Sequence, residues 1–163
     1  MSNCKFDRAK DELYFEDYEI GCVYELGSIG VDEAEIIEFA GRYDPQPFHR
    51  DPKRAKSSVY GGLIASGWHT SCLMMRLLVD HFLSSAASLG SPGVDELRWL
   101  KPVRPGDVLS VTVTIMDAKR SRSKPGRGII QSFIEVSNGA RETVMTMKAA
   151  NIMLCREPSA MDG

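Results

Sequence analysis

Residues 61–82 read GGLIASGWHTSCLMMRLLVDHF, a long and mostly apolar run without a proline. The Gly61-Gly62 pair is typical of a turn, and Ser66 is a favoured residue for the position that precedes a helix. We therefore expect a helix from Ser66 to about Ala87. Apolar residues lie on most of its sides, so several of its faces should be buried. A sheet that wraps around the helix would supply such an environment.

Segments with the length and pattern of β-strands lie on both sides of this helix. Residues 22–30 predict a strand before it, and the strands predicted after it span 94–101, 107–118, 128–138 and 142–154. Val111, Val113 and Ile115 alternate with threonines, as on a strand with one buried face. The order predicts an α+β fold with segregated helices and strands rather than alternating βα units.

Residues 43–52, between the first strand and the long helix, read YDPQPFHRDP. A short amphipathic helix capped by Asp32 should end at Tyr43, just before this segment. Pro45 and Pro47 fix φ and disfavour a helical residue before them, so the chain should continue stiff and extended. The Asp51-Pro52 pair predicts one more short helical turn, because aspartate caps helices and proline suits their first position.

Asp44 and His49 are the candidate catalytic residues of this segment. A carboxylate and an imidazole five residues apart on a stiff loop can face one small volume. Such a pair is suited to holding and deprotonating a water molecule. The alternative interpretation of the spacing is a loop that ends a helix and carries an ordinary surface Asp and His.

The start of the long helix is a second candidate site. The first N–H groups of a helix have no partner within it and carry partial positive charge. At Gly67 they would be able to polarise a carbonyl or hold an enolate oxygen. The alternative is a plain core helix capped by Ser66. His69, in the same first turn, either faces this site or packs and hydrogen-bonds to the backbone.

A resemblance to the MaoC-like dehydratases rests on two segments in the same order. They are Asp44-x-x-Pro47-x-His49-x-Asp51-Pro52-x-x-Ala55 and Gly62-Leu63-Ile64-Ala65-Ser66-Gly67, and a Pro102-x-x-Pro105-Gly106-Asp107 turn follows. These enzymes are related to the (R)-specific enoyl-CoA hydratases. The resemblance extends from about Tyr14 to Met153. It implies a hot dog fold, in which a curved antiparallel sheet wraps one long helix, and an acyl thioester substrate.

The resemblance also implies roles for the matching residues. Asp44 would be the base on the water that attacks C3 of a 2-enoyl thioester, and His49 would share that water and help to return a proton at C2. The N–H of Gly67 would polarise the thioester carbonyl. Many family members have histidine immediately before this glycine, whereas this chain has Ser66, which would hold the helix start or contact the thioester.

The expected function is that of a hydro-lyase that hydrates an enoyl-CoA to a 3-hydroxyacyl thioester, or catalyses the reverse dehydration. Two alternatives stay open, a hot dog acyl-CoA thioesterase and a non-catalytic acyl-thioester binding module. Coenzyme A is expected only as part of the substrate, with no separate cofactor and no metal. A cluster of basic residues between the second and third of the later strands would either clamp its phosphates or form a solvated hairpin tip; it comprises Lys119, Arg120, Arg122, Lys124 and Arg127.

Length and composition fit one globular domain over residues 1–163, with loose tails at 1–13 and 155–163. A net charge of −2 gives no reason to expect nucleic acid as a partner. The four cysteines are scattered, which is typical of reduced thiols in the cytoplasm. The most apolar stretch is broken by His69 and Arg76, so no membrane span is expected. A single hot dog sheet has unpaired edges, and we therefore expect a homodimer or a larger even assembly.

Overall fold

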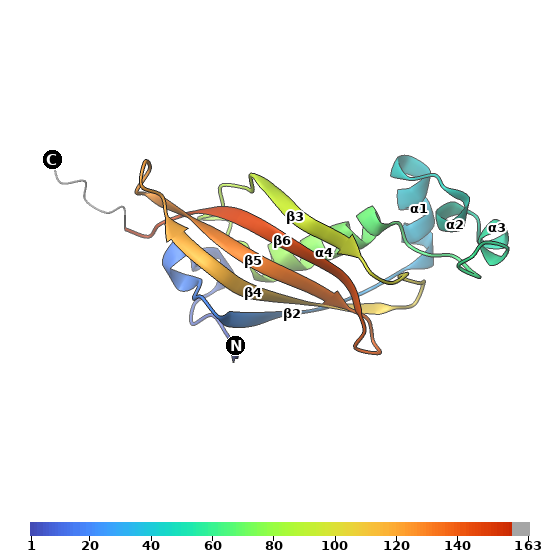
Figure 1. The fold of residues 1–163 in the computed structure, drawn as a ribbon, viewed down its shortest axis with the longest axis horizontal. Coiled ribbons are helices and arrows are strands. Elements are labelled where there is room, and N and C mark those ends of the chain that lie inside the picture. The colour runs from blue at the N-terminus through green and yellow to red at the C-terminus, as the bar shows by residue number, and fades with distance from the viewer. Residues whose placement is uncertain (158–163) are drawn as a thin grey trace.

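A computed structural model of the 163-residue chain describes residues 1–157. Its centre is one curved sheet with the strand order β1-β2-β4-β5-β6-β3 (Figure 1). The strands are β1 (Ser2–Cys4), β2 (Cys22–Gly30), β3 (Gly93–Trp99), β4 (Val108–Arg120), β5 (Arg127–Ser137) and β6 (Thr143–Leu154). Neighbouring strands are antiparallel except β1 and β2, which are parallel.

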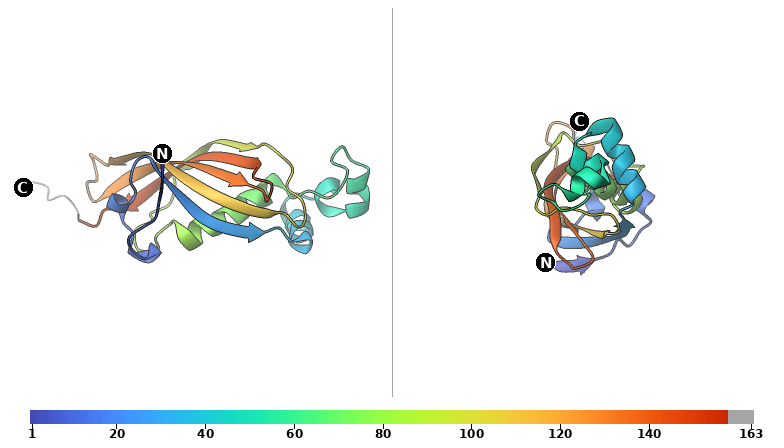
Figure 2. Two further views of the ribbon diagram at one scale, coloured as in Figure 1. Left: turned by 90° about the horizontal axis from the view of Figure 1, so that it is seen from below. Right: turned by 90° about the vertical axis from the view of Figure 1, so that its right-hand side faces the viewer.

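The long helix α4 (Gly67–His81) lies along one face of the sheet (Figures 1 and 2). The side chains of Leu73, Leu77 and Leu78 are buried there, and Ile134 and Val136 of β5 are buried with them in one core cluster. Each such side chain stabilises the fold by about 1.5–3 kcal/mol when it is fully buried. The α+β prediction is thus confirmed, with the sheet wrapped around a helix as in a hot dog fold.

Three short helices lie beyond one end of the sheet (Figure 1). They are α1 (Glu33–Tyr43), α2 (Pro47–Arg50) and α3 (Pro52–Lys56). The Asp32 carboxylate accepts a hydrogen bond from the N–H of Glu35, as the sequence predicted for a helix cap. The Asp51 carboxylate likewise accepts bonds from the first N–H groups of α3. These caps fix where α1 and α3 start, and thereby where the loops before them lie.

Two features of the helices differ from the sequence prediction. The segment after Tyr43 is not extended throughout, because Pro47 begins the helical turn α2, and proline is favoured at a first helical position. Helix α4 ends at His81 rather than near Ala87. The carbonyl of Phe82 accepts a hydrogen bond of 2.6 Å from the Tyr18 hydroxyl, which replaces a partner further along the helix. One row of α4, including Met75 and Val79, is exposed rather than buried.

The N-terminal residues are not the loose tail that the sequence predicted. Strand β1 pairs with β2, Leu13 is fully buried, and the Phe6 ring stacks on that of Tyr24 with centroids 4.1 Å apart. Two 3-10 turns, η1 (Lys10–Glu12) and η2 (Phe15–Asp17), follow β1. A few apolar residues in an otherwise charged segment make these contacts. The overall polar composition of the segment does not reveal them.

The cysteines also differ from the prediction of four reduced thiols. Cys4 of β1 and Cys22 of β2 form a disulfide, because parallel pairing brings together residues that are 18 positions apart. Cys72 and Cys155 are free. Cys155 is buried and its N–H donates to the carbonyl of Gly126, so the predicted C-terminal tail is ordered at its start, while 158–163 lie outside the described residues. Within residues 1–157, no helix is long and apolar enough to cross a membrane.

Candidate functional site

Helix α1 delivers Asp44 to the site as its C-terminal capping residue. Both oxygens of the Asp44 carboxylate accept hydrogen bonds from neutral side chains. The Ser66 hydroxyl donates to Oδ2 and the Gln46 amide donates to Oδ1, each at 2.7 Å. These bonds orient the carboxylate and stabilise its charged form.

The charge of Asp44 follows from this environment. Burial by itself raises the pKa of the Asp44 carboxyl group, but the hydrogen bonds from Ser66 and Gln46, together with the nearby His49, outweigh it and hold the pKa below its usual range. Asp44 is therefore a carboxylate at neutral pH.

His49 lies on α2 and is only 6% exposed. Its Nε2 atom is 3.4 Å from Oδ2 of Asp44, and its Nδ1 atom is 2.8 Å from the carbonyl oxygen of Ile64. The two prolines of the segment thus bring Asp44 and His49 together, as predicted, although the turn of α2 rather than an extended chain does so. The edge of the His49 ring also packs against Phe48.

Ser66 and Gly67 form the start of α4 on the other side of Asp44. Ser66 occupies the capping position and is 1% exposed, but its hydroxyl makes no cap bond and points to Asp44 instead. The prediction that Ser66 caps the helix with its side chain is therefore wrong. Gly67 is the first helical residue, so its N–H has no partner within the helix.

The indole ring of Trp99 covers Gly67. A Cβ atom at Gly67 would lie 2.4 Å from the Trp99 ring, so only glycine fits beneath it. The Trp99 Nε1–H donates to the Ser71 hydroxyl, one turn further along α4, at 3.3 Å. The Trp68 ring packs edge-on against Trp99, and these two rings are 58% and 44% exposed.

Apart from Ser71, these residues line one open cavity of about 560 Å³. The polar part of its wall holds the four residues predicted from the sequence, Asp44, His49, Ser66 and Gly67. Its apolar part includes Phe48, Ile64, Ala65, Val103 and Val144, with Trp68 and Trp99. Such a mixture of convergent polar groups and apolar wall is typical of small-molecule sites.

His69 does not belong to this cavity. Its ring stacks on Phe39 of α1 with centroids 5.0 Å apart and is 5% exposed. Its Nδ1 atom is buried and has no hydrogen-bond partner among the described residues. Burial lowers the pKa of His69, although Glu35 opposes this. His69 therefore packs rather than facing the cavity, but the backbone hydrogen bond expected with that packing is not formed at Nδ1 among the described residues.

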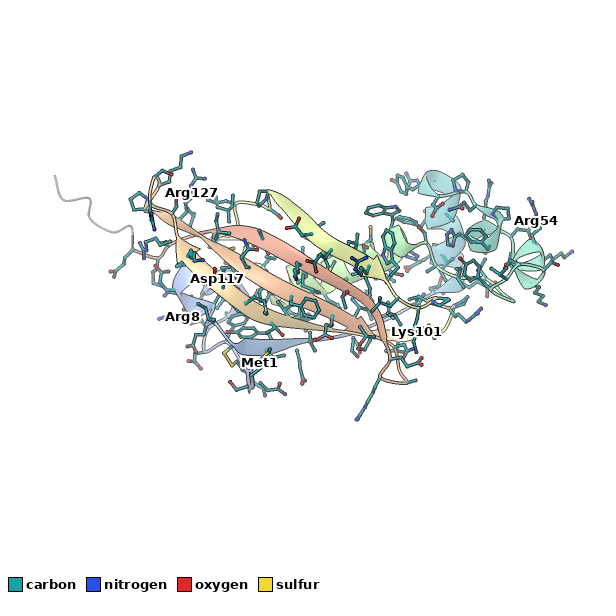
Figure 3. The ribbon with its side chains drawn as sticks, viewed as in Figure 1. Met1, Arg8, Arg54, Lys101, Asp117 and Arg127 are labelled. Atoms are coloured by element: carbon teal, nitrogen blue, oxygen red, sulfur yellow. A yellow bond between two sulfur atoms is a disulfide. The ribbon has the colours of Figure 1, made fainter. Side chains whose placement is uncertain are left out.

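The basic hairpin lies at the far end of the molecule. Figure 3 shows Arg127 at one end and Lys101, which lines the cavity, toward the other. The hairpin joins β4 and β5, and a strand of 11 residues spans about 36 Å. Lys119 and Arg120 form ion pairs with Asp117 and Glu16. The hairpin of one chain therefore does not clamp a thioester bound in that chain's own cavity.

Sequence reasoning missed Gln46 and Trp99. Gln46 stands between two prolines that fix the backbone around it, and it follows Asp44 by two residues, a spacing at which the side chains can meet. No sequence pattern indicated the role of Trp99, because its contact with Gly67 joins positions that are 32 residues apart and meet only in the folded chain.

The family model described as "MaoC like domain" matches residues 18–133. The chain belongs to this family. A MaoC-like dehydratase from Rhodospirillum rubrum has 38% sequence identity and a TM-score of 0.82, over 89% of this chain and 99% of that one. A UPF0336 protein from Thermobifida fusca is 32% identical over 136 residues, which are 80% of this chain and 87% of the relative.

A shorter match carries a named activity. Mesaconyl-CoA hydratase from Haloarcula marismortui is 38% identical over 72 residues, which are 44% of this MaoC-like chain and 20% of the relative. The family and this relative together support a hydratase or dehydratase role in general terms.

Proposed function

We propose that this MaoC-like protein hydrates a 2-enoyl thioester to a 3-hydroxyacyl thioester, or dehydrates it in the reverse direction. One observation carries the proposal: Asp44 and His49 lie 3.4 Å apart in a cavity that Gly67, the first residue of α4, also lines. Addition of water to an enoyl thioester needs both parts, a pair of groups to deprotonate water and a donor for the oxygen that gains charge.

The substrate would lie with its thioester carbonyl against Gly67 and its C3 atom toward Asp44 and His49. Attack of water at C3 moves electrons onto the carbonyl oxygen, where the N–H of Gly67 and the dipole of α4 stabilise the charge. The aromatic wall of Trp68 and Trp99 would border the thioester. Ser66, in place of the histidine common in the family, holds Asp44 rather than the helix start.

Incubation with crotonyl-CoA tests the proposal against both alternatives. Loss of the enoyl absorbance without release of free thiol supports hydration. Release of free thiol would instead identify a thioesterase, in which the carboxylate directs water at the carbonyl. Binding without turnover of any compound in a panel of enoyl-CoA substrates would identify a non-catalytic module.

We also propose that two copies join their sheets at β3. This strand lies at an edge of the sheet, and an edge strand offers unpaired N–H and C=O groups. Met75 and Val79 of α4 and Val94 and Trp99 of β3 are exposed, and they offer apolar surface that a partner could cover. Light scattering coupled to size exclusion should give about 36 kDa, twice the 18.1 kDa of one chain, or an even multiple. A mass of one chain together with full hydratase activity would contradict the dimer.

A further inference from the structure

We propose that the α2–α3 segment, residues 45–62, docks an acidic acyl carrier protein, which brings the acyl group to the cavity on its phosphopantetheine arm. The docking surface is the basic face of this segment, formed by Arg50, Lys53, Arg54 and Lys56. The inference rests on the proposed function and adds to it the kind of partner that carries the thioester.

The basic face concentrates positive charge in a chain that is acidic as a whole. Its four cations lie within residues 50–56, and the whole segment contains one carboxylate, Asp51, whereas the net charge of the chain is −2. All four cationic residues are exposed. The Asp51 carboxylate faces the first N–H groups of α3, from which it accepts hydrogen bonds. Such a local positive field attracts a negatively charged partner and speeds its encounter with the protein.

Intramolecular contacts do not account for these charges. Within residues 1–157, none of the four cations lies in an ion pair. Other exposed cations do form ion pairs, among them Lys101 with Glu142, Lys119 with Asp117 and Lys148 with Glu96. Helix α3 has only five residues, and one cation is enough to complement the dipole at its C-terminal end. The remaining positive charge is available to a partner.

The same segment forms one wall of the cavity. Four of its residues line the cavity: Gln46, Phe48, His49 and Tyr60. The cations of the basic face do not line it. Figure 3 shows Arg54 at the end of the molecule, beyond Lys101, which lines the cavity. A protein bound to the basic face would therefore hold its acyl arm close to the cavity without filling the cavity itself.

Hydrogen bonds fix the segment relative to the cavity. The Arg104 guanidinium donates to the carbonyl oxygen of Tyr60 at 2.6 Å. The N–H of Ile64 donates to the carbonyl oxygen of Phe48 at 3.1 Å. A surface that is already ordered loses little conformational freedom when a partner binds. The basic face is thus a preformed platform beside the cavity.

A protein fits this face better than the phosphates of coenzyme A. Tight phosphate sites converge several donors on one point. Here Arg50 and Arg54 line a shallow pocket of about 390 Å³ together with Asp51, whose carboxylate would repel a phosphate. Val59, in the turn after α3, is 96% exposed. An apolar residue that follows a run of cations suits a protein surface, because protein interfaces combine an apolar core with a polar rim.

The experiment compares kcat/KM for one acyl group, crotonyl, on three carriers: an acyl carrier protein, coenzyme A and pantetheine, which has no charge. We expect the carrier protein to exceed coenzyme A by at least about tenfold, because opposite charges steer its approach. Raising the salt concentration from about 0.05 to about 0.5 M should remove most of this advantage, and it should leave crotonyl-pantetheine unchanged.

Charge reversal locates the docking surface. Lys53→Glu combined with Arg54→Glu should lower kcat/KM for the carrier-protein substrate by at least about tenfold. The loss for crotonyl-CoA should be smaller, and crotonyl-pantetheine should be unaffected. Arg122→Glu combined with Lys124→Glu is the matched control, because these exposed residues of the basic hairpin undergo the same change of charge at the far end of the molecule. The control should change none of the three rates.

Binding of the carrier protein without an acyl group gives a readout that does not depend on turnover. Calorimetry should show binding to wild type that is at least about tenfold weaker in Lys53→Glu/Arg54→Glu and unchanged in the hairpin control. Hydration with equal kcat/KM on the carrier protein and coenzyme A, or an equal loss of both in Lys53→Glu/Arg54→Glu, would overturn the inference and leave the proposed function standing. Absence of hydration on all three carriers would instead refute the proposed function, and the binding measurement would still decide whether the basic face docks the carrier protein.

Discussion

His49 and His69 are buried to nearly the same degree, 6% and 5% exposed; His49 lies on the four-residue helix α2 and His69 in the first turn of α4. Their surroundings differ. His49 has a carbonyl on one ring nitrogen and a carboxylate near the other, and it lines the cavity. His69 has a stacked phenylalanine of α1 and an Nδ1 atom that lacks a partner within residues 1–157. Burial alone thus says little about function. The groups that converge on each ring tell the two apart.

The largest effect should come from removing the partner of His49. Asp44→Asn should keep the fold, shown by an unchanged circular dichroism spectrum, and slow the hydration of crotonyl-CoA by at least about a hundredfold. His69→Phe, made as the comparison, should stay within a few-fold of wild type because this ring does not line the cavity. Near-normal turnover in folded Asp44→Asn would mean that the surroundings of His49 matter no more for activity than those of His69.

A double variant tests whether the residues around His49 act as one unit. Residues that serve one water are not additive, so His49→Ala combined with Asp44→Asn should be little slower than the slower single variant. When Asp44→Asn is combined with His69→Phe, the two losses in rate should multiply, because the two positions share no partner. Fully multiplicative losses in the first cycle would mean that Asp44 and His49 work separately.

A smaller effect should appear in stability. Replacing His69 by phenylalanine removes a buried nitrogen that has no hydrogen-bond partner in the described part of the chain, and such a group costs about 1–3 kcal/mol. We expect His69→Phe to be more stable by about 1 kcal/mol, which raises Tm by roughly 2–4 °C in a chain of this size. His81→Phe, at the exposed end of α4, is the control and should bring no such gain. A lower Tm in His69→Phe would mean that the ring has a partner in solution.

The smallest effect should be a dependence of the free energy of unfolding on pH. The unfolded chain binds a proton at His69 near its ordinary pKa of 6.5, whereas burial lowers the pKa in the folded chain. The unfolded state therefore binds more protons just below pH 6.5, and the free energy of unfolding should fall as the pH drops from about 7 to 5. Asp44 does not contribute in this range, because the pKa of its carboxyl lies lower still. Urea unfolding at several pH values should show this slope in wild type and a reduced slope in His69→Phe.

Much of the fold could be predicted from local pattern, because strand alternation and helix caps are local properties. Strand β2 and helix α1 begin and end where the sequence predicted. The motif segments also predicted the residues that meet in the cavity. The turn at Pro47 was missed because proline suits both an extended segment and the start of a helix.

The remaining errors concern contacts between distant positions. The disulfide of Cys4 depends on the register of β1 against β2, and the separation of the basic hairpin from the site depends on strand length. The side chain of Ser66 has two possible partners, the helix N–H groups and Asp44. Only the three-dimensional arrangement decides between them, and here a charged acceptor outcompetes the helix.

The contact between Gly67 and Trp99 constrains how this protein can evolve. Any side chain at position 67 would collide with the indole ring, which Ser71 holds in place, so a first mutation at Gly67 is strongly disfavoured while Trp99 is present. A smaller residue at position 99 removes that obstacle. The order of substitutions therefore matters: a lineage that keeps the tryptophan keeps the glycine, and with it the open N–H at the start of α4, even if selection for the reaction itself is relaxed.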